Sequence, residues 1–179
     1  NDRHLRAYWD KVPHLLWDKE EDLKYFRSLC AGQEMDFVTT ICPCAGLSRR
    51  NASTSRGSDA EQNYWMMETA RVTLQEIKPK VFWGENAPEL FMKDGKDLVD
   101  KLREIGKENG YSFSMVKTNT ELHGVPQRRV RTFYFFWKSP SVPLLNWKRI
   151  PHKSLTDYLA EIPKSATLQT IYKWSGKAS

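Results

Sequence analysis

The sequence is poor in cysteine and has no long apolar run, and each shortage narrows the class of protein. Its 179 residues include three cysteines, Cys30, Cys42 and Cys44. An odd, small number without a secretory signal favours reduced thiols and a cytosolic setting over a disulfide framework. No second Cys or His pair stands at ligand spacing, so we expect no metal. No apolar stretch approaches the roughly 20 residues that span a bilayer, so we expect no membrane partner.

The composition that remains is that of a basic globular protein. Hydrophobic residues make up 40% of the chain and charged residues 28%, with a formal net charge of +6. A chain of this length can bury one real core. The excess of positive charge is compatible with a nucleic-acid partner, although charge alone does not require one.

The spacing of apolar residues predicts an α/β fold in which short strands alternate with amphipathic helices. The predicted strands cover residues 15–17, 37–42, 81–84, 111–117 and 130–137, and helices begin near residues 18, 64 and 98. Strand and helix alternate three times before two strands that suit a hairpin. We therefore expect a mostly parallel, Rossmann-like sheet with a C-terminal antiparallel hairpin, in which 37–42 pairs with 81–84 and helix 64–78 forms the crossover.

Composition changes after Lys138, which divides the chain in two. Residues 1–138 form the predicted α/β domain, and residues 139–179 are basic and punctuated by proline. Within this extension a helix is expected from Ser154 to Ile162, with Asp157 completing a capping box.

Three segments carry groups suited to chemistry. Pro43-Cys44 with Ser48 follows one predicted strand, Glu85-Asn86 follows the next, and an arginine-rich segment spans residues 127–131. Ligands of open α/β sheets bind beyond the carboxyl ends of the strands. A thiol and a carboxylate at neighbouring strand ends are therefore expected to face one cleft, with arginines beside it.

Taken in this order, the three segments resemble the DNA cytosine-5-methyltransferase family, which has a Pro-Cys loop, a Glu-Asn dipeptide and a Gln-x-Arg-x-Arg motif. The last of these is matched by Gln127-Arg128-Arg129-Val130-Arg131. The stretch from Leu102 to Tyr111 and the lead-in 123–126 are also similar to the family, so the resemblance spans about residues 36–137. The residues around the first two motifs resemble those of a phage-type branch of the family. This resemblance implies a role in restriction-modification and a location in the cytoplasm of a bacterial or phage-infected cell.

The resemblance implies a role for each matched residue. Cys44 is the nucleophile that adds to C6 of cytosine, and Glu85 contacts N3 and the exocyclic amine. Asn86 holds the loop or the base edge, while Arg129 and Arg131 bind the base carbonyl and nearby phosphates. The base must leave the duplex to reach these groups.

Duplex DNA is the partner that the resemblance implies. Ser48, Arg49 and Arg50 lie in a polar loop that matches the family's mobile DNA-contacting loop, and Gln127 begins the arginine motif. Serine and arginine side chains at such positions suit phosphate contacts.

S-adenosylmethionine is the cofactor that the resemblance implies. Asp18 matches the family aspartate near the adenine, although it also suits a plain helix cap, and Pro43 adjoins the expected pocket. The family's glycine-rich cofactor loop has no match in this sequence. We therefore expect a catalytic-half fragment without the first strands, completed by missing segments or by a second polypeptide.

Other functions remain open at the level of sequence. The chain could be a non-catalytic nucleic-acid-binding module that keeps the scaffold, or it could methylate cytosine in RNA. A hydrolase built on Cys44 and His123 would leave Glu85 and the arginine motif unexplained. Taken alone, Cys44 could also be a small buried residue.

Overall fold

The computed structural model describes residues 15–44, 46–47 and 63–162, which fall into two compact units. The first comprises the chain up to Lys117 together with Arg131–Leu144, and the second comprises Thr118–Val130 and the chain from Leu145 onward. No helix in these described ranges is long and apolar enough to cross a membrane. The predicted division at residue 138 remains a prediction.

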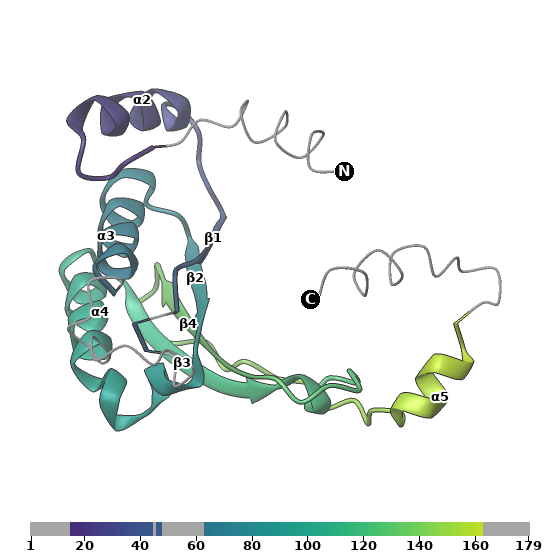
Figure 1. Cartoon of the computed structure of the whole chain (residues 1–179). Helices are drawn as coiled ribbons and strands as arrows, with labels where there is room; N and C mark the ends of the chain where they lie inside the picture. Colours follow the sequence, from purple (N-terminus) through teal and green to yellow (C-terminus); the bar gives the residue numbers. More distant parts are fainter. Residues whose placement is uncertain (1–14, 45, 48–62, 163–179) are drawn as a thin grey trace, which may run out of the picture. The chain divides into compact units, whose positions relative to one another are not determined.

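A four-stranded sheet organises the first unit (Figure 1). Its strands are β1 (Phe37–Ile41), β2 (Val81–Asn86), β3 (Ser112–Asn119) and β4 (Val130–Trp137), in the spatial order β1-β2-β4-β3. The strands β1 and β2 are parallel neighbours in a register that runs from Phe37↔Val81 to Ile41↔Glu85, which confirms their predicted pairing.

The expectation of a mostly parallel sheet was wrong. Only β1 and β2 are parallel, because β4 enters the sheet beside β2 in the antiparallel sense and β3 follows on its outer side. The predicted C-terminal hairpin is therefore present, but it supplies half of the sheet. An antiparallel neighbour needs only a short connection, whereas each further parallel strand would need another crossover.

The crossover between β1 and β2 is the predicted helix. It consists of α3 (Tyr64–Val72), which continues into the π-helical turn η2 (Thr73–Ile77). Lys78 ends it in a left-handed conformation, with φ 53°, just before Pro79. A lone left-handed residue is a common way to terminate a helix.

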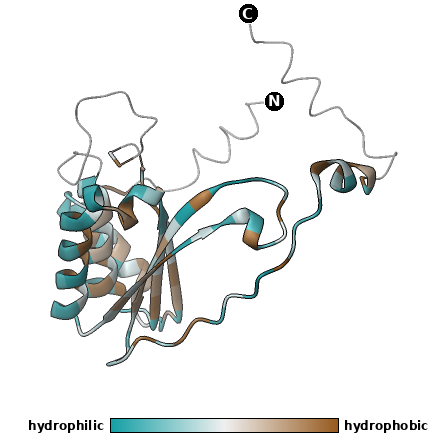
Figure 2. Cartoon of the chain, turned by 90° about the horizontal axis from the view of Figure 1, so that it is seen from below, coloured by the Kyte–Doolittle hydropathy of each residue, from teal (hydrophilic) through white to brown (hydrophobic). Residues whose placement is uncertain are grey.

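The second helix on the sheet is α4 (Lys96–Glu108), which follows the short turns η3 (Pro88–Phe91) and η4 (Lys93–Gly95). Gly110, at φ 77°, then turns the chain into β3. Both α3 and α4 lie on one face of the sheet and direct apolar residues toward it (Figure 2).

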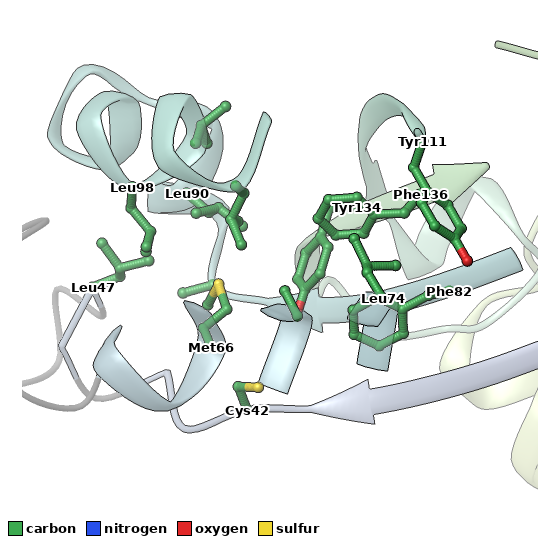
Figure 3. Close-up of a cluster of buried hydrophobic side chains, with 14 residues drawn as sticks. Cys42, Leu47, Met66, Leu74, Phe82, Leu90, Leu98, Tyr111, Tyr134 and Phe136 are labelled. Carbon is green, nitrogen blue, oxygen red and sulfur yellow. The ribbon is translucent and has the colours of Figure 1, made fainter. Parts of the chain in front are cut away.

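The core lies between these helices and the sheet (Figure 3). Phe82, Tyr134 and Phe136 from the strands are fully buried, as are Leu98 and Leu102 from α4. The rings of Phe82 and Phe136 stack with their centroids 5.5 Å apart. Because strand side chains alternate, every second residue of β2 and β4 joins this core.

The other face of the sheet is also aromatic but less covered. Trp83, Phe133 and Phe135 are half-buried there, with Trp83 5.6 Å from Phe133 and 6.3 Å from Phe135 between centroids. Toward the edge, Phe37 is 56% exposed and Ile41 is 77% exposed. In the described part of the first unit, the sheet thus has one closed and one open face.

The start of the described chain differs from the prediction. Residues 15–17 form no strand, because Trp17 packs instead near α3 and donates its indole N–H to Thr69 Oγ1 at 3.3 Å. The helix α2 (Glu20–Cys30) begins after Lys19 without a side-chain cap, so Asp18 is not the predicted cap. The carboxylate of Asp22 instead accepts a hydrogen bond from the Leu16 amide, 2.9 Å away.

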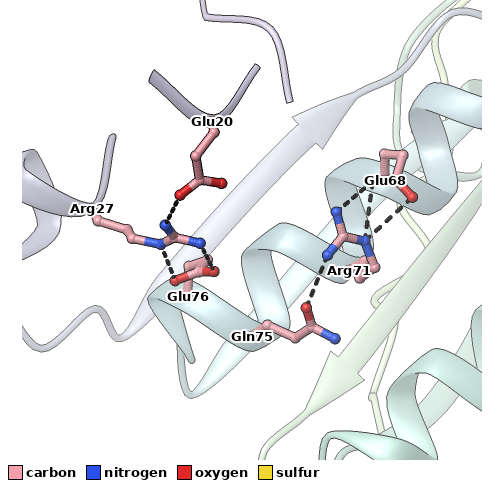
Figure 4. Close-up of polar contacts among 6 residues, drawn as sticks. All are labelled: Glu20, Arg27, Glu68, Arg71, Gln75 and Glu76. Atoms are coloured by element: carbon pink, nitrogen blue, oxygen red, sulfur yellow. Dashed lines mark hydrogen bonds and ion pairs between the residues drawn. The ribbon is translucent and has the colours of Figure 1, made fainter. Parts of the chain in front are cut away.

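Ion pairs connect α2 to the crossover (Figure 4). The Arg27 guanidinium binds both carboxylate oxygens of Glu76, at 2.9 and 2.8 Å, and also Glu20 at 2.9 Å. Arg27 lowers the pKa of the Glu76 carboxyl, chiefly through these hydrogen bonds. Exposed ion pairs of this kind contribute little to stability.

The second unit contains α5 (Leu155–Ala160) and the turn η5 (Thr120–Leu122). The Ser154 hydroxyl accepts a hydrogen bond from the Asp157 amide at 3.1 Å, which confirms the predicted cap, although the helix ends two residues early. His123 forms a β-bridge with Ile150.

The two faces of β4 allow a matched test of the core. We expect Phe136→Ala to lower the free energy of unfolding by about 3–5 kcal/mol, because it leaves a cavity between α4 and β2. Phe135→Ala, on the open face, should lower the free energy of unfolding by clearly less. Urea unfolding of both variants checks this, and equal losses would show that both faces are equally covered in solution.

Candidate active site

The Pro-Cys segment begins directly after β1. Cys42 is buried at 6% exposure, whereas Pro43 and Cys44 are exposed. The Cys44 carbonyl accepts a hydrogen bond from the Leu47 amide at 3.1 Å, and the Leu47 side chain is buried in the core. A short turn anchored in the core therefore presents the Cys44 thiol, and the buried-thiol alternative describes Cys42 instead.

Glu85 and Asn86 are the last two residues of β2, not residues beyond its end as the sequence suggested. The antiparallel partner β4 extends the pairing through Glu85↔Phe133 and Asn86↔Thr132. Since neighbouring strand residues point to opposite faces, these two side chains separate.

Asn86 points into the core and connects β2 to the Pro-Cys segment. It is fully buried, and its Nδ2 donates to the Cys42 carbonyl at 3.5 Å. Its Oδ1 accepts from the Ala87 amide at 2.8 Å. Asn86 thus fixes the backbone two residues before Cys44.

Glu85 lies on the open face, where it pairs with Arg131 of β4. The Arg131 Nε lies 2.5 Å from Glu85 Oε1, and the two side chains are 23% and 21% exposed. A half-buried, hydrogen-bonded ion pair is held more rigidly than an exposed one. The structure therefore brings together two of the predicted site residues from different strands.

Arg129 and Gln127 belong to the second unit, where both are exposed. The Arg129 amide donates to Asn119 Oδ1 at 3.1 Å and to Thr120 Oγ1 at 3.0 Å, and the Gln127 carbonyl accepts from the Thr120 hydroxyl. The backbone at the start of the arginine motif is thus fixed while the side chains of Gln127 and Arg129 face solvent. Convergence of Arg129 with Cys44 remains a prediction.

The remaining predicted residues have less structural context. Ser48, Arg49 and Arg50 lie outside the described residues. Asp18 is an exposed turn residue before α2, so a role beside the cofactor stays a prediction. His123 shares a 2.6 Å hydrogen bond between its Nε2 and Thr118 Oγ1, a structural use of the ring that does not favour the hydrolase alternative.

Sequence reasoning missed a buried polar cluster beneath the Pro-Cys segment. Thr40 of β1 and Thr132 and Tyr134 of β4 place polar atoms on the core face of the two strands that flank β2. Alternation in β4 puts Thr132 and Tyr134 on one face, but only the strand register shows that they reach the ends of β1 and β2.

Comparison with solved structures identifies the fold. The structure is similar to the Entamoeba histolytica methyltransferase EhMeth, with a TM-score of 0.63, 17% identity, and coverage of 88% of this chain and 48% of that one. It is also similar to a prophage-encoded E. coli protein described as a DNA modification methyltransferase, with a TM-score of 0.50, 22% identity, and coverage of 67% and 31%. The fold is that of a methyltransferase.

The family follows from the sequence. Residues 11–178 match the model of the C-5 cytosine-specific DNA methylases, and the chain belongs to that family. It is 31% identical over 108 residues to the type II methyltransferase M1.BsuMI of Bacillus subtilis (strain 168). This aligned segment covers 60% of the present chain. The chain spans about a quarter of the length of that enzyme, since the match covers 24% of it.

The different exposure of the cysteines can be tested by alkylation. In the native protein we expect iodoacetamide to modify Cys44 more than about tenfold faster than Cys42, because Cys42 must first be uncovered by local opening. Peptide mass spectrometry measures both rates. The control Cys44→Ser should leave Cys42 just as slow, and equal rates for the two thiols would contradict the structure.

Proposed function

We propose that this chain carries the catalytic half of an enzyme that transfers a methyl group from S-adenosylmethionine to C5 of cytosine in duplex DNA. The observation that carries the proposal is the exposed Cys44 at the end of β1, next to a strand that ends in Glu85-Asn86, within a member of the C-5 cytosine methylase family.

Cys44 acts as the nucleophile. C5 of cytosine is a weak nucleophile, and addition of a thiolate to C6 makes it enamine-like. The new S–C6 bond places an electron pair on the C5–C4–N3 system, which then bonds to the methyl group that the cofactor supplies. Loss of the C5 proton and departure of the Cys44 sulfur restore the aromatic ring. The turn closed by the Leu47 amide presents the thiol for this attack.

Glu85 stabilises the charge that this addition creates. Its carboxyl group hydrogen-bonds N3, where negative charge accumulates, and accepts from the exocyclic amine, and these contacts act in the transition state. Arg131 holds the carboxyl group through the 2.5 Å ion pair and fixes its direction on the open face. Asn86 holds the Cys42 carbonyl on the other side of the strand.

DNA binding involves the arginine motif and the polar loop. The exposed side chains of Gln127 and Arg129 are presented on a backbone fixed by Asn119 and Thr120. Together with Ser48, Arg49 and Arg50 they supply contacts to phosphates and to the flipped base. The net charge of +6 supports such a partner.

The residues present fit the cofactor only in part. Asp18 and Pro43 are exposed and available to one side of a cofactor pocket, but the sequence has no glycine-rich loop to hold the remainder. We infer that additional segments or a second polypeptide complete the pocket. The half-open aromatic face supports this, because an exposed apolar patch commonly marks an interaction site. The bacterial and prophage relatives favour the cytoplasm of a bacterial or phage-infected cell.

Covalent trapping tests the nucleophile. A duplex carrying 5-fluorocytosine at the target position is incubated with S-adenosylmethionine and the chain, expressed with any coding sequence that adjoins it. Fluorine cannot leave as a cation, so the Cys44 adduct should survive denaturing electrophoresis. Cys44→Ser should abolish trapping, whereas Cys30→Ser should not. Persistent trapping in Cys44→Ser would make Cys42 the next candidate.

The same assay separates binding from chemistry. Glu85→Gln should slow trapping by about a hundredfold at nearly unchanged DNA affinity, because the carboxyl group acts on the reacting base. Arg129→Ala should weaken both affinity and rate. Salt-dependent binding without trapping would favour the binding-module alternative. Trapping of an RNA duplex or tRNA in preference to DNA would favour the RNA alternative.

A further inference from the structure

We propose that Tyr134 is a positioning residue for the nucleophilic turn: it crosses β2 over Gly84 and holds Cys42, two residues before Cys44. The inference deepens the proposed function and rests on it for the role of Cys44. It gives a role to the buried hydroxyl of Tyr134, which has no part in the proposed reaction.

The crossing is possible because residue 84 has no side chain. Gly84 and Tyr134 are direct partners in the β2–β4 register, and Thr40 is the partner of Gly84 on β1. A Cβ at Gly84 would lie 2.3 Å from both Cζ and Oη of Tyr134, far inside van der Waals contact. The end of the phenol ring therefore rests on the glycine, and its hydroxyl extends toward β1 (Figure 3).

The hydroxyl lies near the Cys42 thiol. Tyr134 is fully buried, its hydroxyl oxygen has no hydrogen-bond partner within the described part of the chain, and Cys42 is a polar group close enough to influence it. Burial first, and Cys42 second, raises the pKa of Tyr134 well above its ordinary value. The phenol therefore stays protonated and can donate to the Cys42 sulfur.

Two further contacts hold Cys42 from other sides. Its sulfur lies 3.4 Å from Thr40 Oγ1, and its carbonyl accepts from Asn86 Nδ2. If Tyr134 donates to the sulfur, the thiol can donate to Thr40, so that a chain of polar contacts joins three strands. A buried polar group left unsatisfied is costly, which favours this one arrangement.

Cys42 then transmits the position to the nucleophile. Only Pro43 lies between Cys42 and Cys44, and proline restricts the backbone of the residue before it as well as its own. Holding the side chain and carbonyl of Cys42 therefore limits where the Cys44 turn can lie. A small error in the position of a nucleophile is costly in rate.

The first test uses the chain alone and needs neither DNA nor cofactor. Tyr134→Phe removes the hydroxyl and keeps the ring over Gly84. We expect hydrogen exchange at the amides of Cys44 and Leu47 to become about tenfold faster, as for the loss of one hydrogen bond, with little change in β3. Unchanged exchange at both amides would overturn the proposal whatever the chain does with DNA.

Tyr111→Phe is the matched control. Tyr111 is also buried, and its hydroxyl donates to the Pro79 carbonyl at 2.8 Å, near the start of β2 rather than its end. Burial raises its pKa to about 12, so it too is a neutral donor. This variant should lose stability without faster exchange at Leu47. Equal acceleration in both variants would mean general loosening and would also overturn the proposal.

The second test separates positioning from simple stability in the trapping assay. Where the wild-type protein traps 5-fluorocytosine, Tyr134→Phe should lower the trapping rate about tenfold at unchanged DNA affinity. Tyr111→Phe should trap at the wild-type rate. An unchanged rate in Tyr134→Phe refutes the positioning role and leaves the proposed function standing. Absence of trapping in the wild type, expressed with the coding sequence that adjoins it, counts against the proposed function, and hydrogen exchange still decides the contact.

Discussion

The parallel pairing of β1 with β2 is the constraint on which the candidate site depends. Its register sets Ile41 opposite Glu85, so the chain leaving β1 passes beside the last residues of β2. Asn86 can then reach the Cys42 carbonyl. A shift of one residue would exchange the two faces of the strand and turn Asn86 toward the open face. The crossover helix, closed by Lys78, is what makes this parallel pair possible.

The antiparallel strand β4 adds the second constraint, because it gives each face of β2 a different partner. On the open face, Arg131 meets Glu85 in a half-buried ion pair. On the core face, the phenol of Tyr134 lies over Gly84, and its hydroxyl lies near the Cys42 thiol. One strand therefore fixes the carboxylate directly and supports the thiol indirectly, while the hydrophobic contact of Phe136 with Phe82 holds it in the sheet.

The two faces of the sheet also differ in how far other parts of the chain cover them. The helix-covered face is closed by α3 and α4 and contains the fully buried residues. The other face exposes Phe37 and Ile41 beside half-buried tryptophan and phenylalanine rings. The chain spans less than half of the structures it resembles, and an exposed aromatic face of this kind commonly marks an interaction site.

Local patterns in the sequence were enough to predict the elements and the motifs. Short β-branched and aromatic runs predicted β1, β2 and β4 to within about two residues, and apolar spacing predicted α3 and α4, because alternation and helical periodicity are local properties. Motif order also indicated the family. Three features emerge only in the folded chain: β4 inserts beside β2, residues 15–17 form no strand, and Glu85 faces Arg131. These outcomes depend on which strands pair and in what register, and a pairing energy between residues fifty positions apart leaves no periodic signal in the chain.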